Sequence, residues 1–126
     1  MDKKEWEAIL ERAEKLVALF EKDKDEMVKM YLTENKTLGS HLIKQLKLTK
    51  EQRPIFEDIV DLLLCETYRT VLYAIDGSAS IGGVQQMYKL YDQEDNLISD
   101  CGYLEGAIGN LEAFEDRYTK RKEGKI

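Results

Sequence analysis

The spacing of apolar residues divides this chain into a helical first part and a second part that contains strands. From residue 2 to residue 75, apolar side chains recur at steps of three and four, which is the spacing of a helix face. Just after the segment 76–83 the spacing becomes typical of strands. Three of the chain's eight glycines lie within this segment. Because glycine supplies unusual backbone freedom, the segment is either a demanding structural junction or a binding site.

Two helices are predicted before residue 49. Residues 2–33 form an amphipathic pattern that either continues through the charged run 21–26 or breaks there. Residues 39–48 predict a short helix, whose inward-facing residues are expected to be Leu42, Ile43 and Leu46.

A third helix, over residues 50–75, has the clearest start signal in the chain. Thr49 and Gln52 have the spacing of a capping box. Apolar residues cover more than one side of this helix, which is typical of a helix buried between others. We therefore expect it to be central, with Leu63 and Leu72 in the core.

The second part of the chain predicts a β-hairpin followed by a helix. Residues 84–91 and 97–101 are rich in strand formers and flank a polar turn. Residues 104–121 predict the C-terminal helix. The fold class expected for residues 1–126 is a single α+β domain. It is a mostly helical bundle around a central buried helix, with one antiparallel hairpin before the last helix.

Charge is unevenly distributed along the chain, whose net charge is −6. Residues 36–53 carry five basic residues and one acidic residue, a net of +4. Residues 76–118 carry nine acidic residues against Lys89 and Arg117, a net of −7. An acidic surface repels nucleic acid and suits a basic protein partner. A solvated face that keeps the protein soluble is the alternative interpretation.

Composition argues against several other functions. No apolar run approaches the ~18–20 residues of a membrane span, and the acidic, helical N-terminus does not resemble a signal peptide. We therefore expect a cytoplasmic protein without a membrane partner. Two cysteines and one histidine are too few for a metal site, and no cofactor is expected.

Three sequence patterns in the second part of the chain resemble functional motifs but lack the residues or the structural context that those motifs need. Gly77 and Gly82 have the spacing of a phosphate-binding loop, but Gly83 and Val84 stand where lysine and serine or threonine are needed. The loop also joins a helix to a strand rather than the reverse. A serine nucleophile at this loop would depend on His41, the chain's one histidine, which we expect to have a surface role. A calcium loop beginning at Asp92 lacks its glycine and its final glutamate.

The polar content of the loop keeps a binding role open. A junction needs its glycines but does not need this many serines and glutamines, and the nearby tyrosines suit recognition surfaces. The candidate ligand-binding or partner-binding residues are Asp76, Ser78, Ser80, Gly82, Gly83, Gln85, Tyr88 and Asp92. No catalytic residue is assigned.

The run from Tyr73 to Gln86, followed by the segment 88–92, resembles a segment of small uncharacterised bacterial proteins. Those proteins place a helix before the IDGSxSxGG motif and a hairpin after it. The resemblance implies a bacterial cytosolic origin and transfers no catalytic residues.

The leading functional hypothesis is a non-enzymatic interaction protein. Its concrete form is an immunity-type or inhibitor-type protein that binds a basic partner through the acidic hairpin surface. The alternative is a small-ligand or hydrolytic site at the loop. The chain is expected to be a monomer or a homodimer formed through the hairpin.

Overall fold

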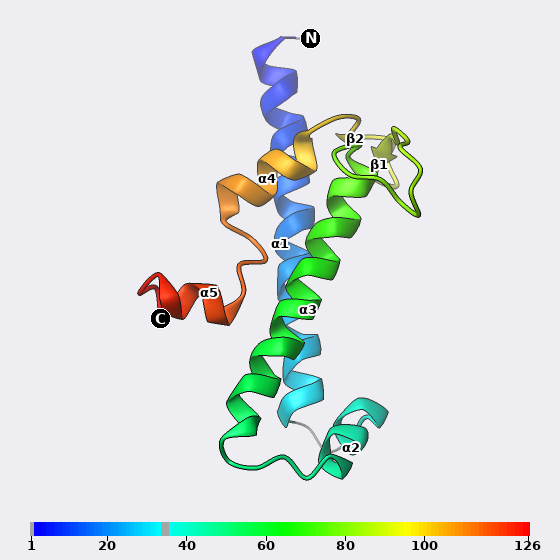
Figure 1. The fold of residues 1–126 in the computed structure, drawn as a ribbon. Coiled ribbons are helices and arrows are strands. Elements are labelled where there is room, and N and C mark those ends of the chain that lie inside the picture. Colours follow the sequence, from blue (N-terminus) through cyan, green and yellow to red (C-terminus); the bar gives the residue numbers. More distant parts are fainter. Residues whose placement is uncertain (1, 34–35) are drawn as a thin grey trace. The chain divides into compact units, whose positions relative to one another are not determined.

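The computed structural model describes residues 2–33 and 36–126 of the chain. These residues form a mostly helical α+β fold with one antiparallel hairpin before the last two helices, which confirms the predicted fold class (Figure 1). The elements are α1 (Lys3–Thr33), α2 (Leu38–Gln45), α3 (Gln52–Ile75), β1 (Leu90–Tyr91), β2 (Leu97–Ser99), α4 (Tyr103–Leu111) and α5 (Arg117–Lys122).

Local sequence signals set the starts of the first three helices. The Asp2 carboxylate accepts the Glu5 N–H at 2.8 Å at the start of α1, and α1 continues without a break through the charged run 21–26. The predicted capping box before α3 is present, because the Thr49 hydroxyl accepts the Gln52 N–H at 3.2 Å and the Gln52 side chain accepts the Thr49 N–H at 3.0 Å. A second box, of Thr37 and Ser40, starts α2.

The chain divides into two compact units, and both α1 and α3 contribute residues to each of them. Unit 1 consists of Met1–Glu21 and Thr67–Phe114. Its core is formed by the beginning of α1, the end of α3, β2 and α4, and its fully or almost fully buried apolar residues include Ile9, Ala13, Val17, Leu72, Ile98, Leu104, Ala107, Ile108 and Phe114. The ring of Tyr68 lies 6.1 Å from the Phe20 ring and 5.9 Å from the Phe114 ring, centroid to centroid.

Unit 2 consists of Lys22–Glu66 and Glu115–Ile126. Its buried apolar residues include Leu32 and Cys65. The expectation that α3 is buried on several sides is wrong here, because Leu63 is 61% exposed. Leu42 and Leu46 on α2 are also more than half exposed, so they do not face inward as predicted.

The hairpin is shorter than the sequence predicts. Leu90 pairs with Ser99 and Tyr91 pairs with Leu97, with an irregularity between the two pairs. Residues 85–89 form no ladder. Ile81 and Val84 instead form an isolated bridge around a tight turn.

The single helix predicted over residues 104–121 is wrong, because α4 ends at Leu111 and α5 begins at Arg117. Glu112 and Phe114 take positive φ values of 50° and 61°. The Phe114 side chain is fully buried, and its N–H donates to the Glu21 carboxylate at 2.6 Å. Burial of the Phe114 ring therefore accompanies a break in the helix that helical periodicity does not reveal. Asp116 then caps α5 through the Thr119 N–H.

Candidate functional site

Asp76 lies at the junction between α3 and the loop and is 2% exposed. Its carboxylate accepts the Leu104 N–H at 3.3 Å and the Glu105 N–H at 3.0 Å, and it also accepts the Ser99 hydroxyl. These two N–H groups belong to the first turn of α4, where Gly102 at the cap position has no side chain to accept them. Asp76 therefore caps α4 from a distant point in the sequence, and its carboxylate is committed to the fold.

The three loop glycines have backbone conformations that other residues rarely adopt. Gly77, with φ 83°, ends α3: its N–H donates to the Ala74 carbonyl and the Ser78 N–H donates to the Tyr73 carbonyl. That pair of bonds is the Schellman motif. A Cβ at Gly77 would also lie 2.5 Å from the Met87 sulfur.

Gly82 and Gly83 form the two central positions of a tight turn, with φ 58° and 81°. Ile81 and Val84 exchange both of their backbone hydrogen bonds at 3.0 Å across it. Such a turn needs positive φ at both central residues, which explains the glycine pair without a ligand.

Two of the polar candidates bind other parts of the same unit. The Ser78 hydroxyl donates to the Glu105 carboxylate at 2.6 Å, and the Gln85 amide donates to the Gly77 carbonyl. Ser80 is exposed. The structure therefore brings Asp76 and Ser78 to the first turn of α4.

Asp92 organises the hairpin turn. Its carboxylate accepts the backbone N–H groups of Glu94 and Asn96, each at 2.9 Å, and the Asn96 side-chain amide at 3.1 Å. The pKa of the Asp92 carboxyl is lowered, mainly because the Asn96 backbone N–H donates a hydrogen bond to it. Asp92, Glu94 and Asn96 have the spacing of the first calcium ligands of a calcium loop, and these hydrogen bonds explain that spacing as part of a hairpin turn.

The apolar residues of the same segment are exposed, which the sequence did not predict. Between residues 81 and 91 five large side chains are 43–62% exposed: Ile81, Val84, Met87, Tyr88 and Tyr91. An exposed apolar segment of this kind marks a binding surface more often than a lone exposed residue does. Tyr88 is thus the candidate whose side chain remains accessible alongside other apolar groups.

His41 makes a local contact within α2. It lies in unit 2, and its Nε2 is 2.9 Å from the Gln45 amide nitrogen in the next turn of α2. The loop serines have no histidine base within unit 1, so a serine nucleophile activated by histidine has no support within that unit.

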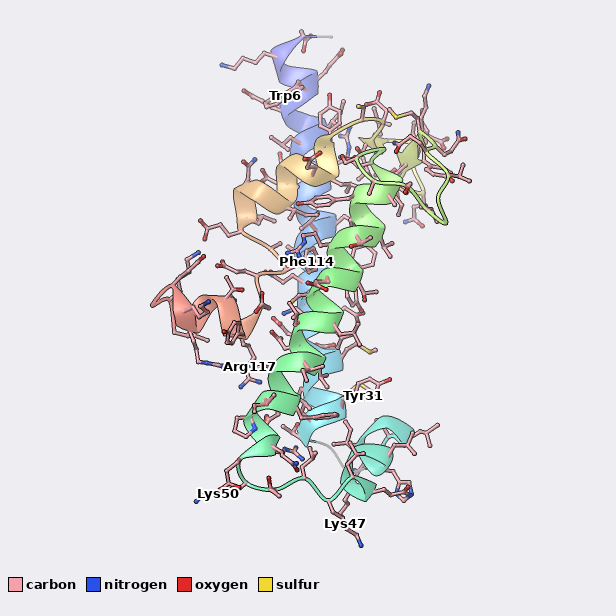
Figure 2. The ribbon with its side chains drawn as sticks, viewed as in Figure 1. Trp6, Tyr31, Lys47, Lys50, Phe114 and Arg117 are labelled. Atoms are coloured by element: carbon pink, nitrogen blue, oxygen red, sulfur yellow. The ribbon has the colours of Figure 1, made fainter. Side chains whose placement is uncertain are left out.

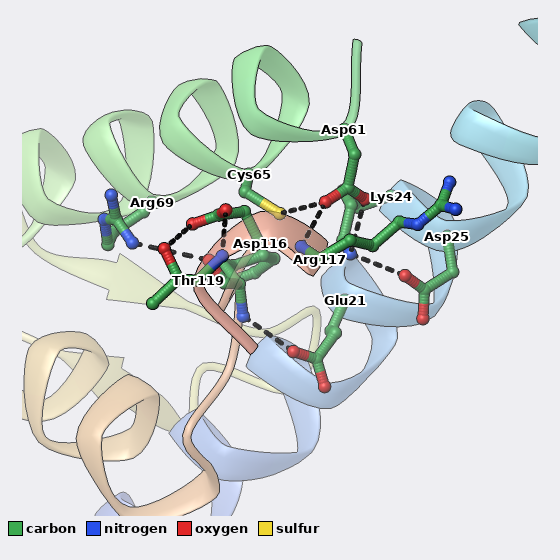
Figure 3. Close-up of polar contacts among 10 residues, drawn as sticks. Glu21, Lys24, Asp25, Asp61, Cys65, Arg69, Asp116, Arg117 and Thr119 are labelled. Carbon is green, nitrogen blue, oxygen red and sulfur yellow. Dashed lines mark hydrogen bonds and ion pairs between the residues drawn. The ribbon is translucent and has the colours of Figure 1, made fainter. Parts of the chain in front are cut away.

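Unit 2 contains a buried polar cluster that the sequence analysis did not identify (Figure 3). Lys24 Nζ lies 2.5 Å from an Asp25 oxygen and 3.9 Å from Asp61 Oδ1. The other oxygen of Asp61 accepts the Arg117 N–H at 2.7 Å and the weak Cys65 thiol donor at 4.0 Å. The spacing Asp61-x-x-x-Cys65 on one helix face was the available sequence signal.

The electrostatics of this cluster argue for a structural role. Burial raises the pKa of the Cys65 thiol to about 11 against the opposing charge of Lys24. Burial lowers the pKa of Lys24, but the hydrogen bond to Asp25 and nearby negative charges outweigh it, so the pKa is raised. At neutral pH the thiol is therefore protonated and the amine charged, which are the unreactive forms of both groups.

A hollow of about 350 Å³ in unit 1 lies between the start of α1 and α4. Trp6 and Leu10 line one part of it, and Cys101, Tyr103 and Asn110 line another. The lining among the described residues holds no acid–base pair. Within the same described part of the chain, no group of three His, Cys, Asp or Glu residues could hold a metal ion, and no helix is long and apolar enough to cross a membrane.

Comparisons of the chain with protein families, with curated proteins and with solved structures found no match.

Proposed function

We propose that this chain is a non-enzymatic protein-binding protein whose binding surface is the exposed segment 81–91 together with the acidic turn 92–95. The observation that carries the proposal is the exposure of Ile81, Val84 and Tyr88, which are 51%, 62% and 43% exposed. Hydrophobic and aromatic side chains of this kind form the centres of protein interfaces.

The charges around the segment suit a basic partner. Asp92, Glu94 and Asp95 form the hairpin turn directly after Tyr91, and Asp92 holds the turn in place through its own hydrogen bonds. An acidic rim beside an apolar centre steers a basic partner and orients it on contact. An immunity-type or inhibitor-type protein with a basic target fits this arrangement.

The alternative of a ligand-binding or hydrolytic loop has less support. Asp76 is buried and bonded to α4, while Ser78 and Gln85 bind other groups of unit 1. A hydrolytic site needs a nucleophile with an adjacent base and an oxyanion-stabilising position open to substrate. Asp76, Ser78 and Gln85 make intramolecular contacts instead.

Site-specific photo-cross-linking tests the proposed surface. A photoreactive amino acid replaces Val84 in one variant and Thr70, an exposed residue on α3 in the same unit, in a control variant. In cells that produce the protein naturally, we expect one discrete basic protein to be cross-linked from position 84 and not from position 70. Equal cross-linking from both positions, or none from position 84, would contradict the proposal.

A further inference from the structure

Unit 2 presents two exposed rows of large apolar side chains. The row on α2 and its C-cap consists of Leu38, Leu42 and Leu46. The row on α3 consists of Ile55, Ile59 and Leu63. The six residues are 52–74% exposed. Side chains four residues apart form a ridge along a helix, and such ridges pack into the grooves of other helices.

A groove of about 730 Å³ lies between α2 and α3, and Leu38, Ile55 and Ile59 lie outside its lining. Leu42 and Leu46 line one wall, and Leu63 lines the other. Tyr31 from α1 also lines the groove, and a Cβ added at Gly39 would lie 1.9 Å from Cε1 of the Tyr31 ring. The groove thus has a preformed apolar shape.

The groove carries almost no polar character. Among the described residues that line it, the Gln45 amide and the Tyr31 hydroxyl are the polar side-chain groups, and none is charged. Lys47 and Lys50 lie in the loop that follows α2 and extend into solvent (Figure 2). The groove lining of each copy would therefore add no charged side chain to a contact between two copies.

The position of the ridge beside the groove favours one kind of partner. A single helix from another protein would fill the groove but leave Ile55 and Ile59 in water next to it. A second copy of this chain presents both the α3 ridge (Ile55, Ile59 and Leu63) and the groove. A two-fold axis between the copies can therefore place the ridge of each copy in the groove of the other.

The exposed area fits such a dimer. If each of these residues, backbone included, has roughly 200 Å² of surface, of the order that large side chains bury, the six residues and Tyr31 expose on the order of 800 Å². That is about the area each partner buries in a standard stable interface. We propose that the α2 and α3 rows of unit 2 form an isologous homodimer interface between two copies of this chain. The residues of this interface belong to unit 2, whereas the proposed partner-binding segment 81–91 belongs to unit 1.

The test is the mass of the protein in solution. Light scattering coupled to gel filtration at micromolar concentration should give twice the chain mass of 14.6 kDa. Ile59→Glu on the ridge and Leu42→Glu on the groove wall should each raise the dimer dissociation constant by on the order of 100-fold, because a charge enters an apolar contact.

Two controls separate the interface from folding and from the hairpin. Val71→Glu has the same chemistry on the same helix, at a residue that is 52% exposed in unit 1, and should leave the dimer intact. Val84→Asp should also leave it intact. Circular dichroism should show that every variant is folded, and binding of an apolar fluorescent dye should rise per chain in Ile59→Glu as the groove becomes accessible.

A wild-type mass of 14.6 kDa throughout the micromolar range would overturn the proposal. Disruption of the dimer by Val84→Asp but not by Ile59→Glu would also overturn it, because the copies would then meet through the hairpin. Equal effects of Val71→Glu and Ile59→Glu on the dimer dissociation constant would overturn it as well.

Discussion

The Asp76 carboxylate accepts the backbone N–H of Glu105 at 3.0 Å, and this contact joins the end of α3 to the first turn of α4. A helix normally receives such a cap from its own N-cap side chain. Here the cap residue is Gly102, and the acceptor comes from 29 residues earlier in the chain. The sequence suggested a binding site at this polar loop, but in the structure Asp76 connects α3 to α4 by capping α4.

Replacing Asp76 should therefore destabilise the protein. In the Asp76→Asn variant an NH₂ group replaces one of the two carboxylate oxygens. Each of these oxygens now accepts a backbone N–H of α4, and an NH₂ group cannot accept one. We expect a loss of about 2–4 kcal/mol in the free energy of unfolding, because buried donors lose a charged partner. Urea unfolding measures it. Asp100→Asn is the matched control, at a half-buried acid in the same unit, and should change stability by less than about 0.5 kcal/mol. Equal effects of the two substitutions would contradict the capping role.

Neighbouring residues on α3 should differ sharply in their contribution to stability. Leu72 is 2% exposed and Val71 is 52% exposed. Leu72→Ala should cost about 2–5 kcal/mol because it leaves a cavity in the core of unit 1. Val71→Ala should cost less than about 0.5 kcal/mol. Chemical denaturation midpoints that move equally for both would show that α3 packs differently from the structure described.

Gly39 should tolerate alanine only when Tyr31 is smaller. A Cβ added at Gly39 would lie 1.9 Å from Cε1 of Tyr31. Gly39→Ala should therefore destabilise the wild-type protein by about 1–3 kcal/mol through overpacking. In a Tyr31→Ala background the same substitution should stabilise by up to about 1 kcal/mol, because alanine favours the helix. A double-mutant cycle at one protein concentration measures this, and additive effects would refute the contact.

Cys65 should make stability fall at alkaline pH. Burial raises its pKa from 9.0 to about 11, so the unfolded thiol ionises first and the folded state loses stability as the pH rises above 9. The neighbouring charges of Lys24 and Asp61 remain in place in a Cys65→Ala variant. Between about pH 8 and about pH 10, wild-type protein should lose about 1.3 kcal/mol more than Cys65→Ala. Urea unfolding at both pH values measures the difference, and parallel losses would contradict the burial of the thiol.

Local signals predicted much of this fold, and long-range contacts explain what they missed. The Thr49–Gln52 box and the polar turn at Asp92 are local and were predicted correctly. The break between α4 and α5 coincides with burial of the Phe114 ring beside Tyr68, which is far away in the sequence. Leu63 looked like a core residue because hydrophobicity does not distinguish a core from an exposed apolar surface. The role of Asp76 depends on a contact across 28–29 residues, which no spacing reveals.

The rate at which the cross-linked partner associates with unit 1 is the most direct test of the binding function. Glu94→Lys combined with Asp95→Asn reverses or removes two charges and leaves the turn-forming Asp92 in place, and asparagine tolerates the positive φ of 62° at position 95. We expect the association rate constant to fall roughly tenfold at low ionic strength and the difference to vanish at high salt. An unchanged rate constant at low ionic strength would contradict the assignment of the acidic hairpin as the binding surface.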